Sequence, residues 1–308
     1  MTPLRKAIRW RDRLLDATTL TLSGCGTYLA FSALFGPIAA TTVLLGCAAI
    51  ATAAQNHPLP DSDAPSSERG RRLLSHFTER ANLQPLAYRE VPRLRNGLAE
   101  FIAARGLELN RKLARRASTP MLAGTIAHEL GHLLYGRQVS NTLKMITAAS
   151  SIGLLPAAGL AVAGGSMMLI AGMAGAAVSS YLLMQMQQRN AELACDRVAT
   201  ILSGERGLIQ AIEANPYKQQ HLPLVRSWQQ NCRPRSLAEQ TINLLDSHPP
   251  LHMRATAMHD YARTFSPHHT GATELELEDS FGHLSRRITR PQRVHKRLNP
   301  AYQCKPAG

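Results

Sequence analysis

The chain has 308 residues, of which 35 are Lys or Arg and 21 are Asp or Glu, so its formal net charge is +14. This length allows one large domain or two smaller ones, and the basic balance favours contact with anionic surfaces, either lipid headgroups or nucleic acid. Aromatic residues make up only 5% of the chain, and its five cysteines form no C-x-x-C pair. We therefore expect no platform for stacked bases, no specific nucleic-acid partner and no disulfide framework.

Two long stretches of the chain, residues 17–60 and 145–188, contain no Asp, Glu, Lys or Arg. Each is about twice the ~20 residues that a helix needs to cross a bilayer. Each also has a break of small residues near its middle, at Gly36-Pro37 and at Gly164-Gly165. This pattern predicts two helical hairpins, at 14–55 and 143–186, and so four membrane spans with the lipid bilayer as a partner.

These stretches have two other interpretations. The first stretch could be a signal peptide, but a second apolar run, Ile38 to Ala54, follows it directly. The second stretch could be a buried hairpin of a soluble protein, because Ala and Gly are only weakly apolar. Lys and Arg flank both hairpins and are missing from their turns, which places both termini and all polar segments in the cytosol. We therefore expect a multi-pass protein of the inner (plasma) membrane.

The remaining segments are polar. A helix is expected from about Ser67 to Asn82, and short extended pieces at Leu86–Val91 and Glu100–Ala104. The helix that leaves the fourth span should continue to Leu202 and end at Gly204, with further helices at about 205–214, 236–246 and 251–263. The segments are a basic leader at 1–13 with Trp10 near the headgroups, a catalytic domain in two parts at 56–142 and 187–265, and a charged tail at 266–308.

The stretch from Ser118 to Gly136 contains the motif H-E-x-x-H, as His128, Glu129 and His132. Ser118 or Thr119 suits the start of a helix and Gly136 its end. Histidines four residues apart project from the same face of a helix. Two such imidazoles can hold one Zn²⁺, with Glu129 beside them as general base. The alternative is an amphipathic helix with two unrelated histidines.

A zinc ion held by two histidines needs a third protein ligand and an open position for water. Glu192 is the best candidate, and Asp196, four residues on, shares its helix face. Asp196 could then fix a ligand histidine through its other ring nitrogen. The alternative is an ordinary solvated acidic face beside Arg189 and Arg197.

A third piece of the sequence, S-H-P-P-L-H-M-R, runs from Ser247 to Arg254. His248 could approach the metal or bind the oxyanion of a tetrahedral intermediate, and Arg254 could brace the site through a carboxylate. Alternatively, His248 is a turn residue and Arg254 forms a structural ion pair.

The order H-E-L-G-H, hydrophobic hairpin, E-x-x-x-D and S-H-P-P…R resembles the HtpX family of membrane-bound zinc metallopeptidases, with the CAAX prenyl endopeptidases as more distant relatives. The resemblance covers roughly residues 15–263. It implies a mainly α membrane protein in which two transmembrane hairpins carry a cytosolic α+β zincin-type domain with a small sheet. The resemblance implies that the zinc ligands are His128, His132 and Glu192. It implies that Glu129 is the general base. It also implies that the supporting residues are Asp196, His248 and Arg254.

This sequence departs from the family pattern at two places. Cys195 stands where the family usually has Ala in E-x-x-A-D, and we expect it to pack, because it lies on a different helix face. The usual N-A-F-A before the substrate-pairing strand reads Asn96-Gly97-Leu98-Ala99. This second change alters the segment that precedes the strand expected to pair with substrate.

The expected function is a zinc endopeptidase in which the metal activates water and Glu129 transfers its proton. The resemblance implies misfolded or partly inserted membrane proteins as polypeptide substrates. A second hypothesis is a membrane-anchored scaffold with a relict metal site. A third, an intramembrane site-two protease, is weaker because Arg115, Arg116 and Arg137 flank the motif helix. The oligomeric state is not predicted.

Overall fold

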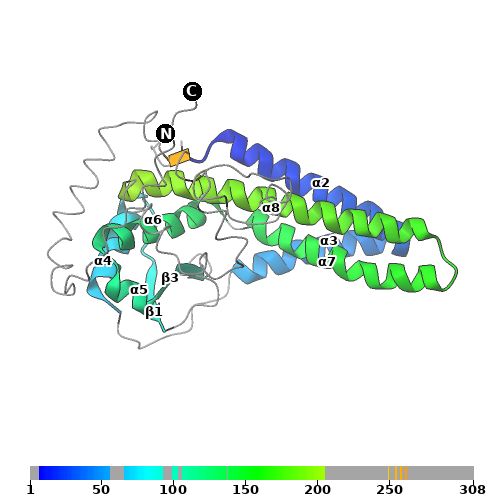
Figure 1. Cartoon of the computed structure of the whole chain (residues 1–308), viewed down its shortest axis with the longest axis horizontal. Coiled ribbons are helices and arrows are strands. Elements are labelled where there is room, and N and C mark those ends of the chain that lie inside the picture. The colour runs from blue at the N-terminus through cyan, green and yellow to red at the C-terminus, as the bar shows by residue number, and fades with distance from the viewer. Residues whose placement is uncertain are drawn as a thin grey trace, which may run out of the picture.

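The computed structural model describes residues 7–55, 66–92, 99–102, 106–136 and 138–204, together with Pro249, Arg254, Ala257, Met258 and Tyr261. Within these residues the chain is mainly helical, with one small sheet (Figure 1). The elements are α2 (Trp10–Phe35), α3 (Pro37–Gln55), α4 (Glu68–Arg80), β1 (Ala87–Val91), β2 (Ala99–Ile102), β3 (Gly106–Asn110), α5 (Arg111–Arg116), α6 (Thr119–Tyr135), α7 (Gln138–Val162) and α8 (Met167–Ser203).

Four helices, α2, α3, α7 and the first part of α8, form an elongated bundle that extends to one side of the molecule (Figure 1). The turns within the two hairpins use Gly36 and Gly164, whose φ angles of +85° and +88° suit glycine because it lacks a Cβ. The two predicted helical hairpins are therefore present. By length and composition, Val139–Val162 and Met167–Ser203 are candidates to cross a membrane, and the shorter Pro37–Ala53 is also apolar.

The sheet has three strands in the order β1-β3-β2. β1 and β3 are parallel, with Ala87 opposite Gly106, and β2 is antiparallel to β3, with Ala99 opposite Leu109. β2 is thus an edge strand, and it lies beside α6. The sequence predicted extended chain close to β1 and β2, but it did not predict β3 or the short helix α5 that follows it.

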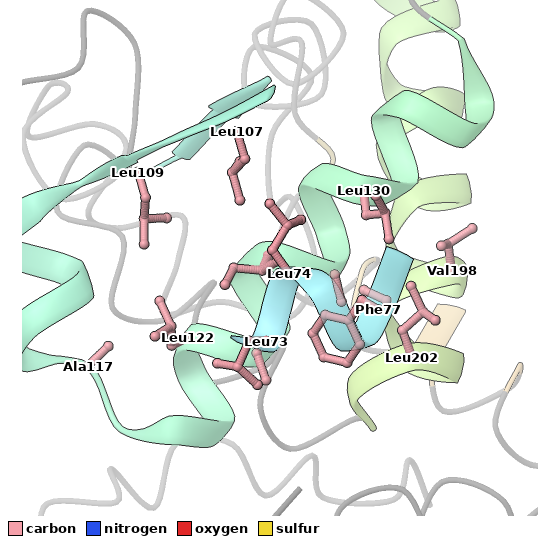
Figure 2. Close-up of a cluster of buried hydrophobic side chains, with 14 of the residues drawn as sticks. Leu73, Leu74, Phe77, Leu107, Leu109, Ala117, Leu122, Leu130, Val198 and Leu202 are labelled. Carbon is pink, nitrogen blue, oxygen red and sulfur yellow. The ribbon is translucent and has the colours of Figure 1, made fainter. Parts of the chain in front are cut away.

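One hydrophobic core joins the sheet to the helices outside the bundle (Figure 2). α4 packs against this core with Leu73, Leu74 and Phe77. Its N-cap is Ser67, close to where the sequence predicted the helix to begin. Successive side chains of β3 point to opposite faces of the sheet, so Leu107 and Leu109 lie on one face, where both belong to this core. The labelled residues in Figure 2 are Leu73, Leu74, Phe77, Leu107, Leu109, Ala117, Leu122, Leu130, Val198 and Leu202. Because α6 and α8 share this core, their mutual position is fixed by packing.

The start of α2 is tied to α6 and α8 by a buried polar network. The Arg197 guanidinium of α8 donates to Asp12 Oδ2 at 2.5 Å and to the carbonyl of Ala7 at 2.8 Å. Asp16 Oδ1 accepts from the Tyr135 hydroxyl at 2.8 Å and from Gln187 Nε2 at 3.1 Å. The described part of the N-terminal segment therefore packs on both helices.

Candidate metal centre

The helix that carries the H-E-x-x-H motif is α6, and its ends agree with the prediction. Ser118 is its N-cap and accepts a hydrogen bond from the Met121 N–H at 3.3 Å, while Gly136, with φ +90°, ends it. His128 and His132 lie one turn apart on one face, and their ring centroids are 4.9 Å apart.

The second half of α8 runs antiparallel to α6 at very short range. A Cβ atom placed on Gly131 would lie 2.7 Å from the Cα of Cys195 and 3.0 Å from its carbonyl oxygen. Such contacts do not occur between real side chains and backbone, so the two helices approach this closely only because residue 131 is glycine. At this close crossing the carboxylate of Glu192 lies near both histidines.

Three potential ligand atoms converge between these helices, from His128, His132 and Glu192. His128 Nε2 lies 3.4 Å from one carboxylate oxygen of Glu192, and His132 Nε2 lies 3.3 Å from the other. Ligands at 2.0–2.1 Å from a tetrahedral zinc ion are separated by about 3.3 Å, whereas a charge-assisted hydrogen bond would be about 2.7–2.9 Å long. The spacing of these donors therefore fits a metal ion.

The other ring nitrogen of His128 faces a buried carboxylate. His128 Nδ1 lies 2.9 Å from Asp196 Oδ1, so the Nδ1–H can donate to Asp196 and leave Nε2 to a metal. Arg254 binds Asp196 with two nitrogen atoms, one of them 2.6 Å from Oδ2. Arg254 Nη2 also lies 3.7 Å from Glu192. The guanidinium thus braces both carboxylates, which is the arrangement expected of a supporting residue.

The charged groups of this cluster shift one another's pKa values. Burial alone would lower the pKa of His128, but the hydrogen bond to Asp196 and the nearby negative charge of Glu192 raise it to about 9. Burial alone would raise the pKa of Asp196, but the adjacent Arg254 holds it below its usual range. The carboxylates of Glu192 and Asp196 thus favour a positive charge beside them, which is the kind of charge that a metal cation would supply.

The second ring nitrogen of His132 faces Cys195. The Sγ atom lies 3.2 Å from His132 Nδ1, and the side chain is fully buried. The prediction that Cys195 packs is confirmed by its place in a buried cluster with Tyr135, Ala191 and Ala194, but the prediction did not include the contact with His132. It overlooked that residues at both 192 and 195 turn toward α6 when the helices cross at Gly131.

Two further predicted site residues are Glu129 and His248. Glu129 follows His128 on α6 and is partly exposed. His248 lies outside the described residues. The structure thus brings His128, His132, Glu192, Asp196 and Arg254 into one cluster, to which it adds Cys195.

Comparison with known families decides the class of protein. A sequence model of peptidase family M48 matches residues 101–262, a little over half of the chain. The chain belongs to peptidase family M48. Comparison with curated proteins and with solved structures gave no match.

The M48 match covers every element of the cluster. It begins within β2, includes α6, α7 and α8, and extends past Arg254. Members of family M48 are metallopeptidases, which agrees with the donor set of two histidines and one glutamate. α2 and α3 lie outside the matched residues, although α2 is bound to α6 and α8 through Tyr135 and Arg197.

Proposed function

We propose that this M48 peptidase is an HtpX-like, zinc-dependent endopeptidase of the membrane that hydrolyses peptide bonds of misfolded or membrane proteins. The observation that carries the proposal is the spacing of the histidine nitrogens and the Glu192 oxygens, at 3.3 and 3.4 Å. Zinc is proposed because two imidazoles and one carboxylate form a three-ligand set that leaves one position open.

The proposed chemistry assigns each side chain a role. His128, His132 and Glu192 would hold a zinc ion, which would supply the Lewis acidity for activating water and polarising the scissile carbonyl. Glu129 takes a proton from the attacking water and later delivers it to the leaving amine. Asp196 orients His128, and Arg254 holds Asp196 and Glu192 in place. The edge strand β2 beside α6 is available to pair with an extended substrate backbone.

Membrane insertion is supported by the distribution of apolar side chains on the bundle. Among the described residues, every exposed large hydrophobic side chain lies on α2, α3, α7 or α8, for example Leu29, Ile38 and Leu155. Polar side chains are instead buried inside the bundle. Ser23 bonds Ser180 at 2.8 Å, and Thr27 lies 2.8 Å from the Ser150 hydroxyl. Apolar groups outside and hydroxyl pairs inside are the arrangement that a lipid environment favours.

The proposed topology has four spans in the inner (plasma) membrane, with the active site in the cytosol, because Lys and Arg flank the hairpins on one side only. Glu192 is six residues beyond the end of the fourth span at 186. At 1.5 Å per residue the metal centre therefore lies on the order of 10 Å from the membrane. This position suits substrates that emerge from the bilayer.

The test compares wild type with Glu129→Gln, both purified in detergent without added metal. We expect close to one zinc per chain in both proteins, because Glu129 is not a ligand. Cleavage of an unfolded protein such as casein should occur only with wild type and should stop when a chelator is added. Full activity in Glu129→Gln would refute the mechanism. Zinc without cleavage in either protein would favour a scaffold with a relict metal site.

A further inference from the structure

At the N-cap and in the first two turns of α2, the basic side chains are exposed and the acidic side chains are buried. Arg9, Arg11 and Arg13 are exposed, whereas Asp12 and Asp16 are buried against α6 and α8. The acids are therefore engaged inside the molecule, Asp12 by Arg197 and Asp16 by Tyr135. The outer surface of these turns is more basic than the local sequence suggests.

The same surface carries exposed apolar side chains. Trp10 is 71% exposed and Leu14 is 55% exposed. The Arg11 guanidinium lies 6.0 Å from the centre of the Trp10 ring. Further along the outside of α2, Leu22 and Leu29 are exposed as well. We call Arg9, Trp10, Arg11 and Leu14 the α2 basic face. It places cations at the start of a helix whose outside carries further exposed apolar side chains, together with the exposed Thr18 and Thr21.

We propose that the α2 basic face binds the headgroups of anionic phospholipids in preference to zwitterionic ones. The proposal rests on the membrane insertion proposed above. Tryptophan favours the headgroup level of a bilayer, and arginines beside it attract negative lipid phosphates. Arg13 contributes less, because its guanidinium stacks 4.9 Å from the Tyr135 ring and lies 3.7 Å from Asp16. Arg9 and Arg11 therefore supply most of the preference.

A lipid fits this surface better than a nucleic acid does. A nucleic acid would neutralise the arginines but leave Leu14, Leu22 and Leu29 exposed to water. A lipid covers both parts at once, with its headgroup at Arg9 and Arg11 and its acyl chains along the outside of α2. Charge and apolar surface are adjacent on one helix, in the order that a phospholipid molecule presents them.

Trp10 itself provides the measurement. The chain has two tryptophans, so Trp228→Phe leaves Trp10 as the only one. This protein is reconstituted in equimolar phosphatidylglycerol and phosphatidylcholine, with brominated acyl chains on one lipid or on the other. Bromine quenches tryptophan fluorescence on contact. We expect stronger quenching when phosphatidylglycerol carries the bromine. The preference should be about fivefold in association for each arginine engaged, and it should weaken as salt is added.

Two variants separate the possible outcomes. Arg9→Gln/Arg11→Gln should bring the preference close to one, whereas the matched control Arg115→Gln/Arg116→Gln, which removes two exposed arginines of α5, should keep it. Equal quenching by both lipids in the parent protein would overturn the headgroup preference and leave insertion intact. Absence of quenching by either lipid would overturn insertion at Trp10 as well. Zinc content and casein cleavage, measured on the same samples, report separately on the peptidase.

Discussion

His128 and His132 have different hydrogen-bond partners at Nδ1, the ring nitrogen that faces away from the possible metal. His128 donates to the carboxylate of Asp196, whereas His132 faces the sulfur of Cys195 at 3.2 Å. Sulfur is a weaker hydrogen-bond acceptor than a carboxylate. Groups in this position typically change metal affinity by 10–100-fold. We predict that Cys195→Ala lowers zinc affinity by about tenfold, measured by competition with a chromophoric chelator.

The conservative variant distinguishes this role from packing. Cys195→Ser keeps an acceptor, so it should bind zinc more tightly than Cys195→Ala. If Cys195 only packed, the order would be reversed, because a buried serine hydroxyl without a partner costs about 1–3 kcal/mol. Cys47→Ala removes a buried thiol from α3, a helix that supplies none of the possible metal ligands, and should leave zinc affinity unchanged. Equal affinity of Cys195→Ala and wild type would contradict the prediction.

Sequence reasoning found the ligand set at this scale but not all of its surroundings. The spacing of His128 and His132 fixes their common face, and Glu192 with Asp196 forms the matching pair on another helix. Cys195 could not be assigned in the same way. Its contact depends on where α8 crosses α6, and the spacing within one helix does not determine that. The glycine at 131, opposite a small residue, is the signal that points to a close crossing.

At the scale of elements, the metal centre depends on how closely α6 and α8 approach. We predict that Gly131→Ala separates them, because the new methyl group would meet the Cys195 backbone at 2.7–3.0 Å. Zinc content should fall well below one per chain, while the helical circular dichroism is retained. Gly172→Ala is the control, because nothing lies within 4 Å of a Cβ at that position. Near-stoichiometric zinc in Gly131→Ala would show that the helices can adjust.

The stability of the fold also depends on the buried ion pair between Asp12 of α2 and Arg197 of α8. Asp12→Asn would leave the Arg197 charge buried without its carboxylate, and we predict a loss of about 3–5 kcal/mol in the free energy of unfolding. Replacing both partners by Asp12→Leu/Arg197→Met should recover part of that loss, because no charge then remains buried. Denaturant unfolding in detergent measures both. A double variant that is less stable than the single one would contradict this account.

The elements themselves were predictable to different degrees. Ser67, Ser118 and Gly136 marked helix ends correctly, because caps are local features. β3 was missed, since its five residues are recognisable only through pairing with β1 and β2. The role of α2 was missed for a related reason. Asp12 and Asp16 share a face, but the partners that bury them lie on α6 and α8.

At the scale of the whole molecule, bundle and metal centre form one continuous structure. α8 contributes to the bundle in its first part and supplies Glu192, Cys195 and Asp196 in its second part. α6 leads after Gly136 into α7, which belongs to the bundle. The beginning of α2 contacts both metal-facing helices. The position of the site is therefore set by helices that also form the exposed apolar surface of the bundle.

Because distant parts of the chain meet at the metal centre, metal removal should weaken the entire fold. His128 and His132 come from α6 and Glu192 from α8, and Arg254 braces the cluster from a part of the chain 58 residues beyond Asp196. A metal bound only by the folded state adds about 2.7 kcal/mol at a free concentration 100 times its Kd. We predict that a chelator lowers the melting temperature of wild type by several degrees, measured by thermal unfolding in detergent. His132→Ala, which lacks a ligand, should melt at the same temperature with and without chelator. Equal shifts in the two proteins would mean that the chelator acts elsewhere.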